Sequence, residues 1–185
     1  MLKRRTEIAH PASGYGSGFF EWIHILFMAV AVAGIINCCI FSIIIIEQHS
    51  MEPTLNEGER VYLSRCAYLF SAPESGDIVV FYEKNSKSNF VKRIIGLPGD
   101  TITIKDGSVY RNDIRLDEPY IKEATSGEFR ITVPENTYFC MGDNRNMSMD
   151  SRDERIGCIE RSEITGKVMF VISPPHSIKQ YTHTQ

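Results

Sequence analysis

The first residue with evident chemical potential is Ser50, whose hydroxyl follows a long apolar stretch by four residues. A serine becomes a nucleophile when a nearby base takes its proton, and a histidine oriented by a carboxylate is the usual base. In an extended segment His49 would face away from Ser50, and His176 and His183 lie close to the C-terminus. A triad of serine, histidine and aspartate is therefore disfavoured. Taken alone, the stretch is more typical of an ordinary junction between a helix and a loop.

Lysine can replace histidine as the base when burial among apolar groups lowers its pKa and leaves the amine neutral. Lys92 has such surroundings, because Lys92 and Arg93 interrupt an otherwise apolar strand at residues 90–95. Neighbouring side chains of a strand face opposite sides. We therefore expect one of the two to reach water while the other faces a cleft. The alternative is an edge strand whose charges prevent further strand pairing.

A third group of polar residues occupies positions 141–152, with the sequence MGDNRNMSMDSR. Asp, Asn and Ser side chains bond to nearby backbone groups and favour rigid turns. By itself this segment is consistent with an elaborate turn and nothing more. Its interest depends on whether the fold brings it close to Ser50 and Lys92.

The element that would position Ser50 is the apolar stretch at residues 22–46, which contains no charged residue over 25 positions. About 20 apolar residues suffice to span a bilayer, so a membrane span is favoured over a buried core helix. A cleavable signal would have a shorter apolar region of about 7 to 15 residues and a small-residue cleavage site. Lys3, Arg4 and Arg5 precede the stretch, which predicts a cytoplasmic N-terminus. We expect an uncleaved, single-pass anchor in the cell membrane, with the rest of the chain extracytoplasmic.

Beyond residue 55, short apolar runs alternate with turn residues, a spacing typical of an antiparallel β-protein. Asp106 and Gly107 separate two such runs and predict a two-residue hairpin, and residues 97–100 predict a turn. Four β-branched isoleucines at positions 43–46 predict that the helix gives way to a strand near residues 41–43. The predicted strands are 59–63, 77–82, 90–95, 101–104, 108–110, 129–133, 137–141 and 164–172.

The expected organisation is therefore mainly β, with one antiparallel β domain behind a single N-terminal transmembrane helix. Its 185 residues, 43% of them hydrophobic and 23% charged, suit one folded domain with an anchor. The predicted parts are a cytoplasmic segment at 1–18, the anchor at 19–43, the β domain at 44–172 and a flexible tail at 173–185.

The charge and the spacing of the cysteines argue against nucleic acid and zinc as partners. From residue 47 onward the chain has 17 basic and 21 acidic residues, a net charge of −4, so nucleic acid is not an expected partner. The five cysteines show neither CxxC nor histidine spacing, which disfavours a zinc site, and we expect neither metal nor cofactor. A bridge between Cys140 and Cys158 is left open, although three buried thiols, at Cys66, Cys140 and Cys158, are favoured.

Four motifs in order, SMEPTL, GDIVVF, VKRIIGLPGD and MGDNRNMSMDSR, lie behind one apolar span. In this order and spacing they closely resemble the bacterial type I signal peptidases, from the anchor to about Arg152. The resemblance implies a largely antiparallel β catalytic domain on the outer membrane surface. It also implies a serine endopeptidase with a Ser-Lys dyad, which removes signal peptides with small residues at P1 and P3 from secretory preproteins. Lysine at position 92 is typical of the bacterial and organellar enzymes. The related endoplasmic reticulum enzymes have a similar motif with histidine at that place.

The resemblance also assigns roles to particular residues of this chain. It makes Ser50 the nucleophile and Lys92 the general base, with Ser148 bonding to Lys92 and orienting it. The residues that would stabilise the polar loop, by ionic contacts or in supporting positions, are Asp150, Arg152, Asp143 and Arg145. The residues that would line an apolar substrate cleft are Ile46, Met51, Leu55, Phe90 and Val91.

Two positions depart from the pattern of the family. Gln48 stands where many relatives have serine or glycine, so the oxyanion would be held by the Ser50 backbone N–H and the Gln48 amide. Losing one oxyanion donor typically costs about 100- to 1,000-fold in rate. After Arg152 the chain continues with Asp153, without the aromatic pair of some relatives.

Three other functions are compatible with parts of the sequence. A non-catalytic, membrane-tethered β-module that binds extended peptides would not need Ser50, Lys92, Ser148 and Asp150 together. A self-cleaving repressor relative is disfavoured by the anchor and by the loop at 141–152. A Ser-Lys peptidase dedicated to a few substrates remains open.

Overall fold

The computed structural model describes residues 17–84 and 86–173, and within these it leaves out the side chains of residues 17, 35–41 and 173. Most of the predicted N-terminal segment at 1–18 and of the predicted tail at 173–185 lies outside the described residues. The chain divides into two compact units, residues 1–38 and 39–185.

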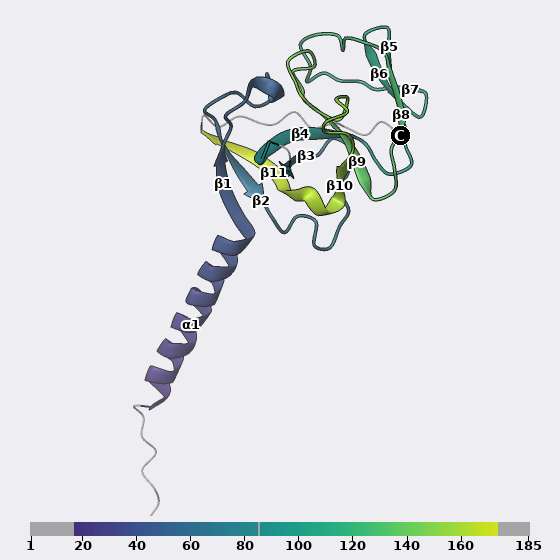
Figure 1. Cartoon of the computed structure of the whole chain (residues 1–185). Helices are drawn as coiled ribbons and strands as arrows, with labels where there is room; N and C mark the ends of the chain where they lie inside the picture. Colours follow the sequence, from purple (N-terminus) through teal and green to yellow (C-terminus); the bar gives the residue numbers. More distant parts are fainter. Residues whose placement is uncertain (1–16, 85, 174–185) are drawn as a thin grey trace, which may run out of the picture. The chain divides into compact units, whose positions relative to one another are not determined.

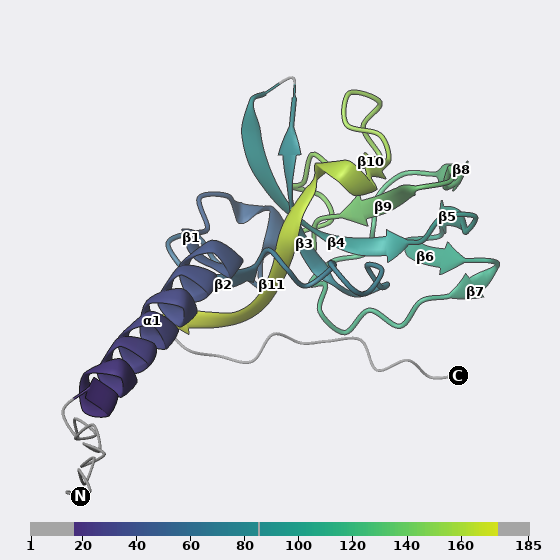
Figure 2. The ribbon, with the colours of Figure 1, turned by 90° about the horizontal axis from the view of Figure 1, so that it is seen from below.

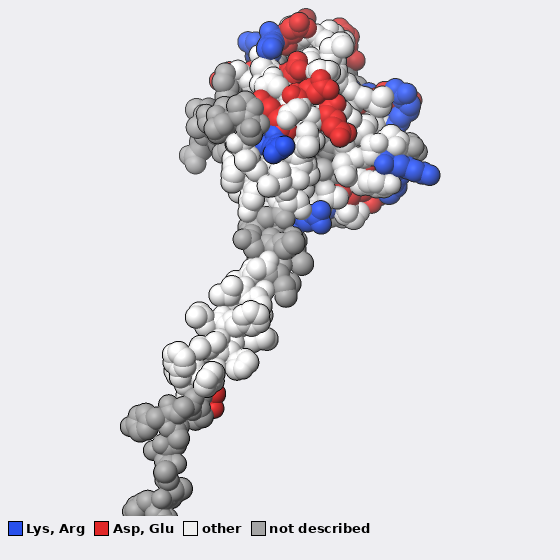
Figure 3. Space-filling model, turned by 90° about the vertical axis from the view of Figure 1, so that its left-hand side faces the viewer, with Lys and Arg blue, Asp and Glu red and all other residues white. Residues whose placement is uncertain are grey.

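The first unit contains most of the helix α1 (Ser17–Ile40), which has no proline to interrupt it. Its large apolar side chains are exposed, with Trp22 at 72% and Phe27 at 69%. Figure 3 shows few charged side chains along α1, whereas acidic and basic groups are scattered over the β unit. Within the described residues, no helix combines the length and apolar character needed to cross a membrane. The span at 19–43 therefore stays a prediction.

The second unit is antiparallel β throughout, as the spacing of apolar runs predicted (Figures 1 and 2). The larger sheet has the strand order β1-β2-β11-β3-β4-β9-β10. The chain leaves α1 directly into β1, so the predicted change from helix to strand near residues 41–43 is confirmed. The strands of this sheet are β1 (Phe41–Ile45), β2 (Arg60–Ser64), β3 (Ile78–Glu83), β4 (Ser88–Gly96), β9 (Thr137–Met141), β10 (Ile159–Glu160) and β11 (Ile164–Ser173).

A smaller sheet follows β4 in the chain and has the order β7-β6-β5-β8. Asp106 and Gly107 both have positive φ, 50° and 75°, as the predicted two-residue hairpin between β5 and β6 requires. The Asp100 N–H donates to the Leu97 carbonyl at 3.0 Å and closes the predicted turn. The strands are β5 (Thr101–Lys105), β6 (Ser108–Arg111), β7 (Ile114–Arg115) and β8 (Phe129–Thr132).

The strand β4 occupies an inner position, because it pairs with β3 on one side and β9 on the other. Residues 90–92 pair only with β3 among the described strands, and from residue 93 onward the alternative of an edge strand is wrong. So is the expectation that Lys92 or Arg93 reaches water, since their exposed fractions are 1% and 0%. Arg93 can be buried because Asp143, also fully buried, pairs with its guanidinium. The sheet thus carries two adjacent cationic side chains into the interior.

Candidate active site

Ser50 lies in a single 3₁₀ turn, η1 (His49–Met51), which follows β1 after a short connection. Met51 and Leu55 are 1% and 0% exposed and anchor the turn in the core, while Ser50 itself is 7% exposed. The Leu55 N–H donates to the Met51 carbonyl at 3.0 Å and continues the turn. Burial on the C-terminal side of Ser50 therefore fixes where its hydroxyl points.

His49 lies in the 3₁₀ turn and not on an extended segment. The expectation that the His49 and Ser50 side chains face opposite sides of an extended segment is therefore wrong. Its exposed ring points instead to two carboxylates, with Nδ1 2.8 Å from Glu52 Oε1 and Nε2 3.2 Å from Glu57 Oε2. The hydrogen bond to Glu52 and the charges of Glu57 and Glu52 raise the pKa of His49. Ser50 instead contacts Lys92.

Lys92 reaches Ser50 from β4, and its Nζ donates to Ser50 Oγ at 2.6 Å. The same amine lies 5.2 Å from the centre of the Phe90 ring. Burial lowers the pKa of Lys92 to about 8, although Asp150, Cys140 and Asp143 act in the opposite direction. A lysine in this setting is neutral over much of the mildly alkaline range. It can therefore accept a proton from the hydroxyl beside it.

The polar loop that follows β9 is stabilised by Asp150 and Arg152. Arg152 Nε donates to Asp150 Oδ1 and Arg152 Nη2 donates to Asp150 Oδ2, both at 2.8 Å. Asp150 also accepts the Gly142 N–H at 2.9 Å, and Arg152 donates to the Arg145 carbonyl at 2.6 Å. The ionic contact expected between these two residues is present.

Asp143 and Arg145 pair with residues outside the loop rather than with each other. Asp143 accepts two hydrogen bonds from Arg93, at 2.9 and 2.7 Å, and one from the Thr54 hydroxyl. Arg145 pairs with Glu118 and donates to it through Nη1 at 2.7 Å. Sequence reasoning missed Thr54 and Glu118, since their loop partners are 89 and 27 positions away.

The loop also bonds to the turn that carries Ser50, through Asn144. The Asn144 backbone N–H donates to the Ser50 carbonyl at 3.0 Å, and its side-chain amide donates to the His49 carbonyl at 3.1 Å. Gly142 lies against the same turn, because a Cβ there would collide with the Ser50 carbonyl and the Ser148 side chain. Neither residue was singled out from the sequence, although both lie within the motif at 141–152.

Ser148 differs from what the resemblance implied. Its Oγ is buried and has no hydrogen-bond partner among the described residues, so the expected bond to Lys92 is not formed. The side chain packs against the α-carbon of Gly142, while the Lys92 amine points to Ser50. Ser148 therefore lies in the neighbourhood of the site with an unused hydroxyl.

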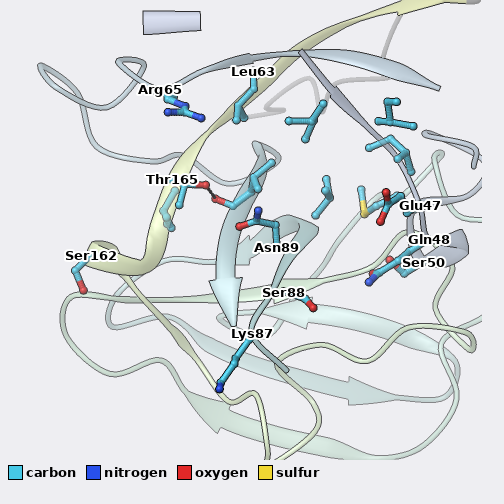
Figure 4. Close-up of a pocket in the computed structure, with 17 residues that line it drawn as sticks. Glu47, Gln48, Ser50, Leu63, Arg65, Lys87, Ser88, Asn89, Ser162 and Thr165 are labelled. Carbon is cyan, nitrogen blue, oxygen red and sulfur yellow. Dashed lines mark hydrogen bonds between the residues drawn. The ribbon is translucent and has the colours of Figure 1, made fainter. Parts of the chain in front are cut away.

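A cleft of about 820 Å³ opens beside Ser50 (Figure 4). Three of the five predicted substrate-binding residues line it, namely Ile46, Met51 and Val91. The other two do not. Leu55 is fully buried in the core cluster around Val61, and Phe90 packs on Phe81 because it faces the side of β4 opposite Val91.

Gln48 lies at the margin of the cleft. Figure 4 shows Gln48, Glu47 and Ser50 together at one end, well separated from Arg65 and Ser162. Gln48 is exposed and has an extended backbone, with φ −129° and ψ 147°, immediately before the turn. Gln48 and Ser50 therefore line the same end of the cleft.

The cysteines whose side chains are described are free thiols, Cys66, Cys140 and Cys158. The bridge between Cys140 and Cys158 that the sequence left open is not formed. Cys140 is fully buried, and its burial raises the pKa of the thiol, whereas the other two are partly exposed. The expectation that all three would be buried is correct only for Cys140.

Sequence comparisons with known proteins point to one family. The family described as "Signal peptidase, peptidase S26" matches residues 19–173. Signal peptidase I of Bacillus licheniformis is 36% identical over 175 residues, covering 89% of this chain and 94% of the relative. Signal peptidase I T of Bacillus subtilis is 35% identical over 189 residues, with 96% and 97% covered. A crystal structure of a signal peptidase I from Enterococcus faecalis is 30% identical and covers 54% of this chain and 98% of that chain, with a TM-score of 0.48.

Proposed function

Because the chain belongs to the signal peptidase family, peptidase S26, it is a serine endopeptidase, and we propose that it cleaves signal peptides from exported preproteins with a Ser-Lys dyad. Ser50 is the nucleophile and Lys92 the general base. The observation that carries this assignment is the buried contact of 2.6 Å between Lys92 Nζ and Ser50 Oγ.

The reaction begins when neutral Lys92 takes the Ser50 proton as Oγ attacks the scissile carbonyl carbon. The C–N bond then breaks, the protonated Lys92 gives its proton to the leaving amine, and the mature protein departs. A water molecule, deprotonated by Lys92, attacks the remaining ester. Its cleavage releases the signal peptide as an acid, and Ser50 Oγ regains a proton from Lys92.

The oxyanion that forms during attack needs donors on the cleft side of Ser50. The Ser50 backbone N–H and the Gln48 side-chain amide are the proposed donors. The place of Gln48 beside Ser50 at the cleft margin supports this assignment (Figure 4). Each donor of this kind contributes about 100- to 1,000-fold to the rate.

The substrate is proposed to bind as an extended segment between the stretch that precedes Ser50 and the N-terminal part of β4. Ile46, Met51 and Val91 line this cleft and would contact small side chains at P1 and P3. Large substrate side chains would clash with these apolar walls, which accounts for the expected preference for small residues.

The loop at 141–152 is proposed to hold the dyad in place. Asp150 and Arg152 make the loop rigid, and Asp143 and Arg145 connect it to β4 and to the segment around Glu118. Ser148 is proposed to bond to the Lys92 amine during catalysis. Its buried and unpartnered hydroxyl supports such a role.

A membrane anchor at residues 19–43 is proposed to keep the β domain, 44–172, at the outer face of the cell membrane, with a cytoplasmic N-terminus. Support comes from the 25 uncharged positions at 22–46 and from the exposed apolar side chains of α1. The bilayer would then hold enzyme and preprotein in the same two-dimensional space, which raises their effective concentration.

The assignment is tested by cleavage of a purified preprotein by the full-length chain in detergent micelles. Ser50→Ala and Lys92→Met should each lower kcat by about 1,000-fold or more, since dyad members act as a unit. Ser108→Ala and Lys122→Met change the same residue types outside the site and should leave cleavage unchanged. Normal processing by Ser50→Ala or Lys92→Met would contradict the proposed dyad.

A further inference from the structure

Behind the dyad lies a buried stack of charged and aromatic side chains that the proposed reaction does not use. Its centre is Tyr120, which is 1% exposed and belongs to the connection between β7 and β8. The Arg93 guanidinium lies 4.0 Å from the centre of the Tyr120 ring, and the Arg145 guanidinium lies 5.8 Å from it. Two buried cations therefore share one aromatic ring.

Each guanidinium of this stack also has its own carboxylate. Arg93 makes two hydrogen bonds to Asp143, and Arg145 makes two to Glu118. The Tyr120 hydroxyl donates to Glu118 at 2.8 Å. Burial of two like charges is costly unless each is paired and hydrogen-bonded, and this arrangement provides both.

The stack joins three segments that are distant in sequence. Arg93 directly follows Lys92 on β4, and Asp143 directly precedes Asn144, whose backbone donates to the Ser50 carbonyl. Tyr120 and Glu118 come from a connection that neither lines the cleft nor contacts Ser50. This connection thus packs against Arg93, the strand neighbour of Lys92, and against Arg145 of the loop that bonds to the Ser50 turn.

We propose that Tyr120 and Glu118 are positioning residues, which hold the strand that carries Lys92 and the loop that tethers Ser50 at their reactive separation. The inference rests on the proposed roles of Ser50 and Lys92. The ring spaces the two guanidiniums, and Glu118 fixes Arg145, which also donates to the Gly142 carbonyl at 3.2 Å. Loss of the ring lets Arg93 and Arg145 move and admits water beside β4.

The test uses the full-length chain in detergent micelles with a preprotein substrate. Tyr120→Leu removes the ring at similar volume, and Tyr120→Phe keeps the ring but removes the hydroxyl. Tyr68→Leu is the matched control, because Tyr68 is also buried, also donates to a carboxylate and has the Arg161 guanidinium 5.2 Å from its ring centre. Arg161 is not among the groups that shift the pKa of Lys92.

For Tyr120→Leu we expect kcat to fall roughly tenfold or more while KM stays within about twofold, since only the geometry of the dyad changes. The midpoint of the alkaline rise in kcat should move to higher pH, because water beside Lys92 weakens the burial that lowers its pKa. The groups whose charges shift the pKa of Lys92 are all retained in Tyr120→Leu, namely Asp150, Cys140, Asp143 and Arg152. Tyr120→Phe should stay within about threefold of the wild type.

A folded Tyr120→Leu protein with the same kcat and pH midpoint as Tyr68→Leu would overturn the proposal. If Tyr120→Leu does not fold, Glu118→Gln replaces it, with Glu163→Gln as the control for a carboxylate paired elsewhere. The proposal is supported if Glu118→Gln lowers kcat and moves the pH midpoint while Glu163→Gln does neither. It is overturned if Glu118→Gln also leaves both unchanged. Ser50→Ala and Lys92→Met are measured in parallel, so that a wrong dyad is distinguished from a wrong positioning role.

Discussion

At the scale of single residues, the proposed site depends on Lys92, which the fold buries and which we propose as the base. Burial favours the neutral amine, and the neighbouring carboxylates Asp150 and Asp143 limit the effect, so that the pKa of Lys92 is about 8. A lower value would make the amine too weak a base, and an ordinary value would leave it protonated at neutral pH. Catalysis and stability therefore make opposite demands on Lys92.

Burial of Lys92 lowers the stability of the folded chain wherever the amine is protonated. The folded pKa of Lys92, about 8, lies below its ordinary value of 10.5, so the charged form opposes folding below pH 8. Between these pH values the unfolded chain binds more protons, and the stability of the wild type rises with pH. Lys92→Met should therefore raise the free energy of unfolding at pH 7 by about 1 to 3 kcal/mol. The gain should shrink towards pH 10.

Urea titrations of the detergent-solubilised chain at pH 7 and near pH 10 measure this difference. Lys122→Met, an exposed substitution, should change stability little at either pH. A Lys92→Met protein less stable than the wild type at pH 7 would contradict a buried lysine whose charge opposes folding.

At the scale of elements, the candidate active site lies where the loop after β9 meets the η1 turn. Gly142 marks the closest approach, since its α-carbon lies between the Ser50 carbonyl and the Ser148 side chain. Gly142→Ala should push the loop away from Ser50 and lower kcat by about tenfold or more. The control is Gly34→Ala in α1, where a Cβ meets nothing within 4 Å.

Cleavage assays with both glycine variants check this prediction, and circular dichroism confirms that each is folded. A folded Gly142→Ala protein with the activity of the wild type would show that the loop and the turn are not closely coupled.

The sequence predicted most elements because each strand of four or more residues in the β unit carries its own apolar run between turn residues. Two-residue strands such as β7 and β10 leave no such pattern. The contact between Ser50 and Lys92 follows from the order and spacing of four motifs, because each motif alone is consistent with an ordinary turn or strand. The burial of Arg93 could not be predicted, because it depends on Asp143, 50 positions away, and on the Tyr120 ring. The side on which Leu55 and Phe90 lie could not be predicted either, because it is set by the packing of the core.

At the scale of the whole molecule, the proposed function requires the β unit to meet substrates at the outer face of a membrane. The full chain should remain in the membrane fraction after alkaline extraction, because no charge interrupts residues 22–46. Protease added to the outer face of intact cells or spheroplasts should degrade the β unit. Recovery of the chain in the soluble fraction would contradict the anchor, and full protection of the β unit would contradict its orientation.

The measurement that tests the central claim most directly is site-resolved labelling of the full-length chain with a serine-acylating probe, read by mass spectrometry. We expect a single acyl group on Ser50, formed faster as the pH rises through about 8, where Lys92 loses its proton. Lys92→Met should slow the labelling by about 100-fold or more, because the hydroxyl loses its base. Labelling at another serine, or equally fast labelling of Ser50 in Lys92→Met, would contradict the Ser-Lys assignment.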